Sequence, residues 1–231
     1  MWAEFRGLKI AVDARVLVFL NDEPYAEVVA TPLELEYLAL GLLYTRGIID
    51  GLGQIKRLEV KGTEVRAYVD SPRSGGGILR EYEDCAGSAE PAGLARRAAD
   101  GARDMNYVEI AVRLAPEFSK FTMPSTEPQL AMHTSALYLS GRWLVAHDTS
   151  RHSSVLKLVG KALELGGSYD DAVAFTTGRL SADMVVALAR LGMPVAVSLR
   201  GPLYSALTAA CRYGAAVVAN VRGRGFVQLC P

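Results

Sequence analysis

The sequence contains little cysteine, no long apolar run and no net charge, and each shortage excludes a class of protein. Its 231 residues include three cysteines, too few and too scattered for a disulfide scaffold or a four-thiolate zinc site. No run approaches the roughly 18 uncharged apolar residues that a membrane helix needs. Charged residues scattered through the first 21 positions are unlike a signal peptide, so we expect a cytoplasmic protein without membrane contact. With 50% apolar and 22% charged residues the chain is an ordinary globular protein, not a disordered one.

The zero net charge conceals two parts of opposite sign. Up to Leu130 the chain has 15 Lys and Arg against 20 Asp and Glu, whereas the remainder has 10 against 5. All three histidines lie in this second part, and no acidic residue follows Asp183. We therefore expect any anionic ligand to bind the basic second part.

The first part of the chain predicts a small α+β domain, which we assign to residues 1–104. Strands are expected within 8–20, 54–60 and 65–69, because apolar and β-branched residues alternate there. A helix is expected over 31–43, with Thr31 as its cap, Pro32 in its first turn and Gly47 as its end. The glycine-rich stretch after Ser71 predicts a mobile loop over about 71–90, followed by a short helix over 92–103.

The second part alternates strand-like and helix-like segments, which is typical of a three-layer α/β domain, here assigned to residues 105–231. A strand or helix is expected over 107–114 and a loop over 115–128, which contains three prolines. Beyond this loop, the predicted strands are 143–146, 172–176, 194–198 and 215–221. The predicted helices are 153–165, 182–191 and 204–213. Ligands of such domains bind where strands end and helices begin.

Three loops of this domain join a strand to a helix and carry cationic side chains. Arg151 and His152 fall at one helix start, with Lys157 further along the same helix, and helix N-termini attract anions. Arg179 follows Gly178 in a second loop, and Arg200 lies in a third. All three should reach the same sheet edge and form one anion site. The alternative is that each is an ordinary capped turn, with Asp148 or Ser150 capping the first helix and Ser181 the second.

The C-terminal segment provides a fourth cationic loop. Two arginines alternate with two glycines after the last predicted strand, in the order Asn220, Val221, Arg222, Gly223, Arg224, Gly225. Such a turn can wrap a phosphate group. A solvated hairpin without a ligand fits the same residues.

Cys85 follows the glycine-rich stretch, where an exposed thiol could act as a nucleophile or a sulfur carrier once its thiolate is stabilised. Most single cysteines are instead small buried hydrophobic residues. Cys211, inside an apolar helix, is expected to be one of these, whereas Cys230 is ambiguous. Several other chemistries are absent from the sequence, including C-x-x-C pairs, Walker loops, nucleophile elbows and the H-x-E of zinc deaminases.

Five blocks in order resemble the formate dehydrogenase accessory sulfurtransferase family, FdhD/NarQ. The segment from Thr31 to Ile49 resembles the family's N-terminal block, and 132–136 resembles its G-x-x-H-A-A block. Residues 148–153 match D-V-G-R-H-N, 177–181 match S-G-R-x-S, and 220–224 match F-V-R-G-x-R. The resemblance covers nearly the whole chain.

The resemblance implies a cytidine-deaminase-like fold without zinc for the second domain, and a homodimer. It also implies that the protein takes persulfide sulfur from a cysteine desulfurase and passes it to the molybdenum or tungsten bis-pterin guanine dinucleotide cofactor of formate dehydrogenase. Cys85 would carry the sulfur, and GDP would mimic the cofactor. The implied cofactor contacts are Asn220, Val221, Arg222, Gly223, Arg224, Gly225, His133, Arg151, His152 and Arg179, with no metal held by the protein.

The sequence departs from the family at several positions. The family's loop has C-G-x-C, whereas Ser88 stands at the second cysteine position here. Ser150 and Ser153 replace a glycine and an asparagine, and Asn220 replaces a phenylalanine. Because a serine hydroxyl cannot exchange with sulfur, any step that needs a second thiol is lost. A cofactor-binding chaperone without sulfur transfer is therefore a second hypothesis. A phosphate- or RNA-binding module is a third, disfavoured by the few aromatic residues available to stack on bases.

Overall fold

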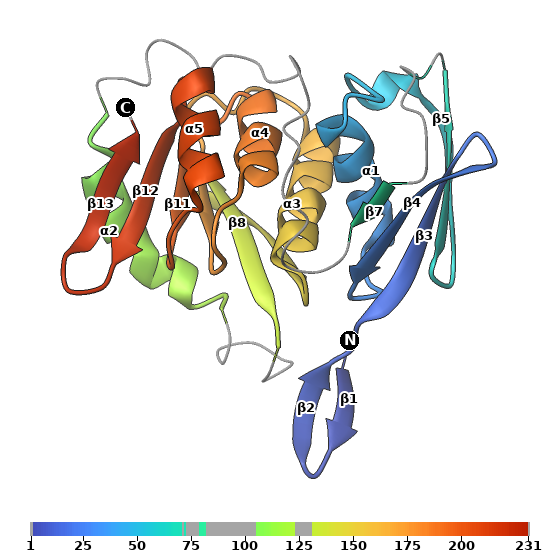
Figure 1. Cartoon of the computed structure of the whole chain (residues 1–231), viewed down its shortest axis with the longest axis horizontal. Helices are drawn as coiled ribbons and strands as arrows, with labels where there is room; N and C mark the ends of the chain where they lie inside the picture. Colours follow the sequence, from blue (N-terminus) through green and yellow to red (C-terminus); the bar gives the residue numbers. More distant parts are fainter. Residues whose placement is uncertain (1, 71, 73–78, 82–104, 123–130, 231) are drawn as a thin grey trace.

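The structure is a computed structural model that describes residues 2–70, 72, 79–81, 105–122 and 131–230. Two sheets lie side by side with helices packed between them, and a two-stranded hairpin extends from the N-terminal side (Figure 1). This hairpin consists of β1 (Trp2–Phe5) and β2 (Leu8–Ala11), which pair antiparallel. The described helices include none that is long and apolar enough to cross a membrane.

The N-terminal sheet has five strands in the order β5-β6-β3-β4-β7. These strands are β3 (Ala14–Leu20), β4 (Glu23–Ala30), β5 (Ile55–Lys61), β6 (Glu64–Val69) and β7 (Leu79–Glu81). Helix α1 (Leu35–Thr45) and the short 3₁₀ helix η1 (Leu52–Gln54) connect β4 to β5. The expected strands of the first part are therefore confirmed, with ends that differ by one or two residues.

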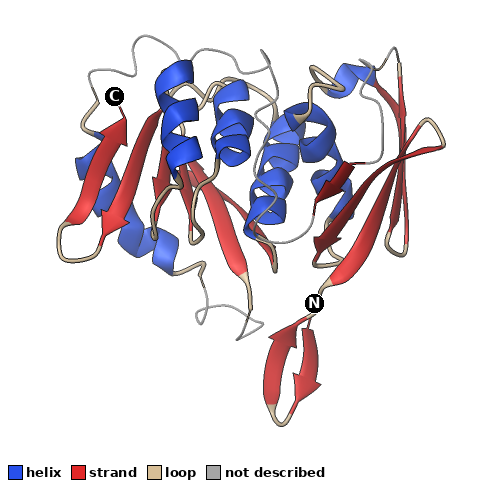
Figure 2. Cartoon of the chain, in the orientation of Figure 1, coloured by secondary structure: helices blue, strands red, loops and turns tan. Residues whose placement is uncertain are grey.

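The C-terminal sheet has six strands in the order β13-β12-β11-β10-β8-β9. Its strands are β8 (His133–Leu139), β9 (Arg142–Asp148), β10 (Val173–Thr176), β11 (Val195–Ser198), β12 (Ala216–Val221) and β13 (Gly225–Cys230). Its helices are α2 (Tyr107–Ser119), α3 (Arg151–Leu165), α4 (Ala182–Arg190) and α5 (Tyr204–Tyr213). Helices α3, α4 and α5 cover one face and α2 the other, which makes three layers (Figure 2).

The central strands β10 and β11 show why this sheet forms. Every residue of both strands is buried, and they pair in parallel with each other, as β11 does with β12. Continuous apolar runs of this kind are typical of parallel strands covered on both faces.

The predicted α/β class, with a smaller α+β part beside it, is confirmed. The predicted boundary after residue 104 falls at the edge of the segment outside the described residues, and it remains a prediction.

The two sheets share one hydrophobic core, because α1 packs directly against α3. A Cβ atom added to Gly41 would lie 1.9 Å from the backbone oxygen of Leu156, and one added to Gly160 would lie 2.1 Å from that of Tyr37. Since real Cβ atoms do not approach backbone this closely, the two glycines allow the helices to cross in contact. A second cluster, with Phe118, Trp143 and Phe175 at its centre, lies on the other face of the sheet beneath α2.

Two of the predicted helix boundaries are wrong. Thr31 does not cap α1, which begins at Leu35 after Glu34 in a left-handed conformation with φ of 54°. Thr31 is instead fully buried and contacts the C-terminal domain. The loop expected from residue 115 starts later, because α2 continues to Ser119 with Pro116 inside it.

The strands β1, β4 and β7 of the first part were not expected, and neither were β8 and β13 of the second. β8 begins with three polar residues, and half of β13 is exposed, so neither has a clear apolar pattern. The prediction for Cys211 is also wrong, because its side chain is exposed and forms a disulfide with Cys230. The pairing brings together residues 19 positions apart, which the sequence pattern did not indicate.

Candidate functional site

A cavity of about 590 Å³ opens at the edge of the C-terminal sheet where β10 and β11 end. We call it the arginine pocket. Of the residues that the structure describes, nine line it: Thr122, Met132, His133, Arg151, Thr177, Gly178, Arg179, Leu199 and Arg200. The expectation that the three strand-to-helix loops meet at one edge is confirmed, since each contributes an arginine to this cavity.

The loop after β10 is held in place by hydrogen bonds to β8. The Thr177 backbone N–H donates to the Thr134 carbonyl at 2.9 Å, and the Thr134 N–H donates to Thr177 Oγ1 at 3.0 Å. His133 Nδ1 lies 3.4 Å from the same hydroxyl. This reciprocal pairing fixes the imidazole of His133 at the pocket wall.

Gly178 allows close contact between this loop and the start of α3. A Cβ atom at this position would lie 2.8 Å from Cβ of Arg151 and 3.4 Å from Nδ1 of His133. The Gly178 carbonyl accepts a hydrogen bond from Ser198 Oγ at 2.8 Å. The absence of a side chain at Gly178 therefore lets Arg151 pack across the loop and reach the pocket.

The loop after β11 is organised by Ser198, which is fully buried. Its hydroxyl oxygen accepts hydrogen bonds from the N–H groups of Arg200 at 3.1 Å and Gly201 at 2.9 Å. The turn formed in this way places Arg200 at the pocket. Arg200 belonged to one of the predicted anion loops but not to the set of expected cofactor contacts, although its strand-end position carries the same signal as Arg179.

The charge of the pocket comes from Arg151, Arg179 and Arg200. Arg179 and Arg200 are exposed, whereas the Arg151 side chain is only 4% exposed. No carboxylate occurs among the nine described lining residues. A planar guanidinium is less strongly hydrated than an ammonium and binds phosphate oxygens in pairs, so three of them favour a polyanion.

Lys157 does not take part in this pocket, although it was expected to contribute to anion binding. Its Nζ is fully buried, lies 2.5 Å from Asp148 Oδ2 and donates to the Thr31 carbonyl at 3.0 Å. Asp148 also accepts from the Ser150 N–H at 2.9 Å. Burial raises the pKa of Asp148 above its ordinary value, and the charge of Lys157 and the backbone donors offset this only in part. Lys157 is therefore paired with Asp148 inside the protein and does not face the pocket.

Ser150 caps α3, as the ordinary-turn alternative predicted, and its hydroxyl accepts from the Ser153 N–H at 3.4 Å. The helix start is not a solvated surface feature, however, because Arg151 beside it is buried against the pocket. Capping and pocket formation therefore occur together at this helix.

The structure does not bring His152 to the arginine pocket. Its Nε2 lies 2.9 Å from Ser181 Oγ and 3.1 Å from Asp183 Oδ2, at the start of α4. Burial alone would raise the pKa of Asp183, but the His152 and Ser181 hydrogen bonds and nearby charge lower it. His152 therefore links α3 to α4, and its contact with Ser181 holds the end of the loop that carries Arg179.

The predicted cationic turn at the C-terminus is the exposed hairpin between β12 and β13. We call residues 220–225 the arginine hairpin. The Arg224 N–H donates to the Val221 carbonyl at 2.9 Å, and Gly223 and Gly225 have positive φ. Because β12 runs parallel to β11, this turn lies at the same sheet edge as the pocket. None of its residues is among the described lining of the pocket.

Cys85 and Ser88 lie outside the described residues. The described chain nearest to Cys85 on its N-terminal side is β7, which pairs in parallel with β4 and places Glu81 opposite Val28. Groups of three or more His, Cys, Asp or Glu side chains suited to hold a metal ion do not occur in the described part of the chain.

The fold and the pocket define an α/β protein with an arginine-lined cavity at one sheet edge, in which a smaller α+β domain carries the segment leading to Cys85. The FdhD/NarQ family model matches residues 11–228. The chain belongs to the FdhD/NarQ family.

Individual relatives agree over nearly the full length. The protein named sulfur carrier protein FdhD of Methanothermobacter thermautotrophicus is 26% identical over 94% of this chain and 88% of its own. The protein of the same name in Agrobacterium fabrum is 28% identical over 87% of this chain and 80% of its own. A crystal structure described as a formate dehydrogenase accessory protein from Desulfotalea psychrophila superimposes with a TM-score of 0.73 at 25% identity, covering 97% of this chain and 89% of that one.

Proposed function

We propose that this protein is a sulfur carrier that serves a formate dehydrogenase. Cys85 would accept sulfur from a cysteine desulfurase and deliver it to the molybdenum or tungsten bis-pterin guanine dinucleotide cofactor, which is the substrate. The observation that carries this proposal is the arginine pocket, where Arg151, Arg179 and Arg200 converge beside His133. The names of the relatives support the sulfur-carrier role.

The pocket suits one nucleotide end of the cofactor. Its volume of about 590 Å³ lies in the usual range of small-ligand sites. Arginine guanidinium groups can bind a diphosphate through paired hydrogen bonds, and they can also bind the O6 and N7 acceptors of guanine. The arginine hairpin, at the same edge, would add Arg222 and Arg224 around the remaining phosphates or the second nucleotide.

Sulfur transfer would proceed by exchange at Cys85. Its thiolate would attack the outer sulfur of a persulfide on the desulfurase, forming a new S–S bond while the desulfurase thiolate leaves with the electron pair. Cys85 would then hold the persulfide for delivery of its outer sulfur to the metal. Since Ser88 cannot form a disulfide, the proposal uses one thiol throughout.

The connection of β7 to the rest of the fold supports delivery of this sulfur to the pocket. β7 and β4 run in the same direction, and β4 leads to Thr31, whose N–H donates to Asp148 at the base of α3. Cys85 follows Glu81 by four residues, a length of chain that spans at most about 14 Å. The thiol is therefore tethered to β7, whose neighbour β4 leads to the start of α3.

Two experiments test this proposal. Mass spectrometry after incubation with a cysteine desulfurase and cysteine should show about 32 Da added to Cys85 as a persulfide. Label confined to Cys211 or Cys230 would reject Cys85 as the carrier. Calorimetric titration with GDP should show binding that weakens in Arg179→Ala, Arg200→Ala and the Arg222→Ala/Arg224→Ala double variant. A short RNA titrated at two salt concentrations is the control for non-specific anion binding.

The second candidate function is a chaperone that binds the cofactor without transferring sulfur, which Ser88 favours. In that case Cys85→Ser should leave maturation of the client dehydrogenase intact. Loss of maturation with unchanged GDP binding would reject the chaperone and support the carrier. We also propose that the protein acts in the cytoplasm as a homodimer, whose mass sedimentation can measure.

A further inference from the structure

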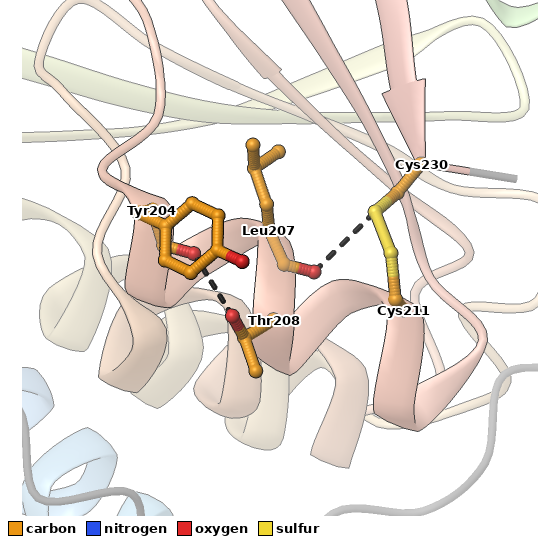
Figure 3. The surroundings of a disulfide bond; sticks show 5 residues. All are labelled: Tyr204, Leu207, Thr208, Cys211 and Cys230. Carbon is orange, nitrogen blue, oxygen red and sulfur yellow. Dashed lines mark hydrogen bonds between the residues drawn. A yellow bond between two sulfur atoms is a disulfide. The ribbon is translucent and has the colours of Figure 1, made fainter.

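A disulfide joins the two C-terminal elements of the fold. Cys211 is in the last turn of α5, and Cys230 is the final residue of β13, with Cα atoms 5.7 Å apart (Figure 3). Among the described strands, β13 lies at the edge of the six-stranded sheet and pairs with β12 alone. The bond therefore ties an edge strand to the helix that packs beside it.

In the described structure β13 is held by its ladder to β12, by Phe226 beneath α2 and by the disulfide. Of its six residues Cys230 is the only one that is buried, whereas Phe226 and Val227 are half-buried and the others exposed. The ladder to β12 is also irregular near the disulfide, since Val217 faces Cys230 and Val218 faces Gln228. At this end of the strand the disulfide is thus the covalent link to α5, and Cys230 is the buried side chain.

The arginine hairpin lies at the opposite end of the same two strands. Arg222, Gly223 and Arg224 connect β12 to β13 and are all exposed. Apart from Phe226, which packs against the core beneath α2, the hairpin depends on β13 remaining paired. Release of Cys230 would lower the free energy needed to open β13 and so loosen the turn that carries both arginines.

The two sulfur atoms differ in accessibility. Cys211 is an exposed residue, whereas Cys230 is 5% exposed, so we expect a thiolate from solvent to attack at Cys211. Its attack there forms a mixed disulfide and breaks the Cys211–Cys230 bond, and Cys230 leaves as a thiolate that is then protonated. A second thiol releases Cys211, so two thiols are oxidised to a disulfide while the protein gains two thiols.

The reduced state is accommodated by the same surroundings. Cys230 Sγ lies 3.3 Å from the backbone oxygen of Leu207 in α5 (Figure 3). A disulfide sulfur has no hydrogen to donate, but the thiol released by reduction can donate one to this oxygen. Both redox states therefore leave Cys230 in a satisfied buried position, which permits the reaction to run in either direction.

We propose that Cys211 and Cys230 form a reversible thiol–disulfide exchange site whose redox state sets the order of the arginine hairpin. Low-molecular-weight thiols would open the site at Cys211, and low-molecular-weight disulfides would close it. The consequence for ligand affinity rests on the proposed function, because it requires Arg222 and Arg224 to contact the anionic cofactor. The effect on the strand itself is independent of any ligand.

The experiment uses the full chain with Cys85→Ser, so that the sulfur carrier does not react, in an oxidised and a reduced preparation. Amide hydrogen exchange of β13 should be about 200-fold faster after reduction, the factor that the loop-closure model gives for a loop of roughly this size. Amides of β10 and α3 should not change and are the internal control. Adding Cys211→Ser/Cys230→Ser should reproduce the reduced pattern and remove the response to reductant. If that variant does not fold, comparison of the two preparations of the Cys85→Ser chain still decides.

Measuring the GDP affinity of the oxidised and the reduced preparation completes the test. We expect the reduced chain to bind GDP at least about fivefold more weakly, a difference in the range of typical coupling between sites. Equal affinity with faster β13 exchange would overturn the link to the ligand. Unchanged β13 exchange, or rapid alkylation of Cys211 and Cys230 in the oxidised preparation, would overturn the site itself. An oxidised chain that does not bind GDP would contradict the proposed function, whereas the exchange result would still decide for the redox site.

Discussion

Lys157 on α3 and Asp148 at the end of β9 form an ion pair, with 2.5 Å between Nζ and Oδ2, and both side chains are fully buried. Lys157 Nζ and the Asp148 carboxylate also bind the backbone of Thr31, the residue directly after β4 of the N-terminal domain. One pair of charges thus joins β9, α3 and β4 behind the arginine pocket. Its energetics and those of its surroundings lead to four predictions.

Loss of one member of this pair should destabilise the protein strongly. Lys157→Met leaves the Asp148 carboxylate buried without its cation, which should lower the free energy of unfolding by about 3–5 kcal/mol. The double variant Asp148→Asn/Lys157→Met removes both charges and should recover most of this loss. Urea unfolding of the four chains in the mutant cycle measures the difference. As a control, Arg57→Ala, from the exposed pair with Glu59, should change stability by at most about 1 kcal/mol.

The crossing of α1 and α3 should not tolerate a methyl group. Gly160→Ala would place its Cβ 2.1 Å from the Tyr37 carbonyl oxygen, so the helices must separate and lose packing in the shared core. We expect a loss of about 1–3 kcal/mol or more in thermal or urea unfolding. Gly53→Ala, whose added Cβ meets no atom within 4 Å, is the matched control. Equal stability of the two variants would contradict the close crossing.

Gly178 should control ligand binding through Arg151. The Cβ of Gly178→Ala would lie 2.8 Å from that of Arg151 and displace this side chain from the pocket. We expect GDP affinity to fall about tenfold, as for the loss of one charge-assisted hydrogen bond. Gly201→Ala changes a neighbouring loop at the same edge without any close contact and should bind GDP as the unmodified chain does. Calorimetry on both variants separates the contact from a general effect of alanine.

Stability should decrease in mild acid because of His147. Burial first, and then the charges of Lys161 and Lys157, lower the pKa of His147 below its ordinary 6.5, against a smaller opposing effect of Glu34. The unfolded chain therefore binds this proton more tightly. The stability gained from a neutral His147 in the folded state is complete above pH 6.5. It is lost as the pH falls towards the pKa of His147 in the folded state.

The variant His147→Asn tests this assignment. The amide of asparagine occupies the position of Nδ1, which lies 3.0 Å from the Thr134 hydroxyl, and it does not titrate. The urea midpoint of the unmodified chain should fall more steeply between about pH 7 and pH 5 than that of the variant. Parallel curves would show that another group is responsible. Asp183, whose pKa is lowered, acts in the same direction but below its ordinary value of 3.8.

Local patterns predicted the helices and the buried strands of the second part well. The prediction that cationic loops gather at one edge followed from topology, because parallel strands joined by helices end on the same side. Orientation within the loops could not be obtained in this way. Arg151 and His152 are neighbours in sequence, yet consecutive helical residues point about 100° apart, so one lines the pocket and the other meets α4.

Partners distant in sequence were also beyond local prediction. Thr31 has the chemistry of a helix cap, but burial against Asp148 decided its role. Cys211 has the surroundings of an apolar helix residue, but its exposure and the approach of β13 decided its pairing with Cys230. In both cases the partner, Asp148 or Cys230, lies in a different secondary-structure element. No rule of sequence spacing connects a residue to a partner of this kind.

By itself the sequence determined the fold class, the asymmetry of charge and the set of cationic loops, because periodicity, turn chemistry and composition are local properties. Tertiary structure alone decided which cations face solvent or ligand and which are neutralised inside the protein. Lys157 and Arg151 show the difference, since both are buried cations of one helix and only Arg151 lines the pocket. The physical reason is desolvation: a buried charge must find a partner, and the packing of the two sheets brings Asp148 to Lys157.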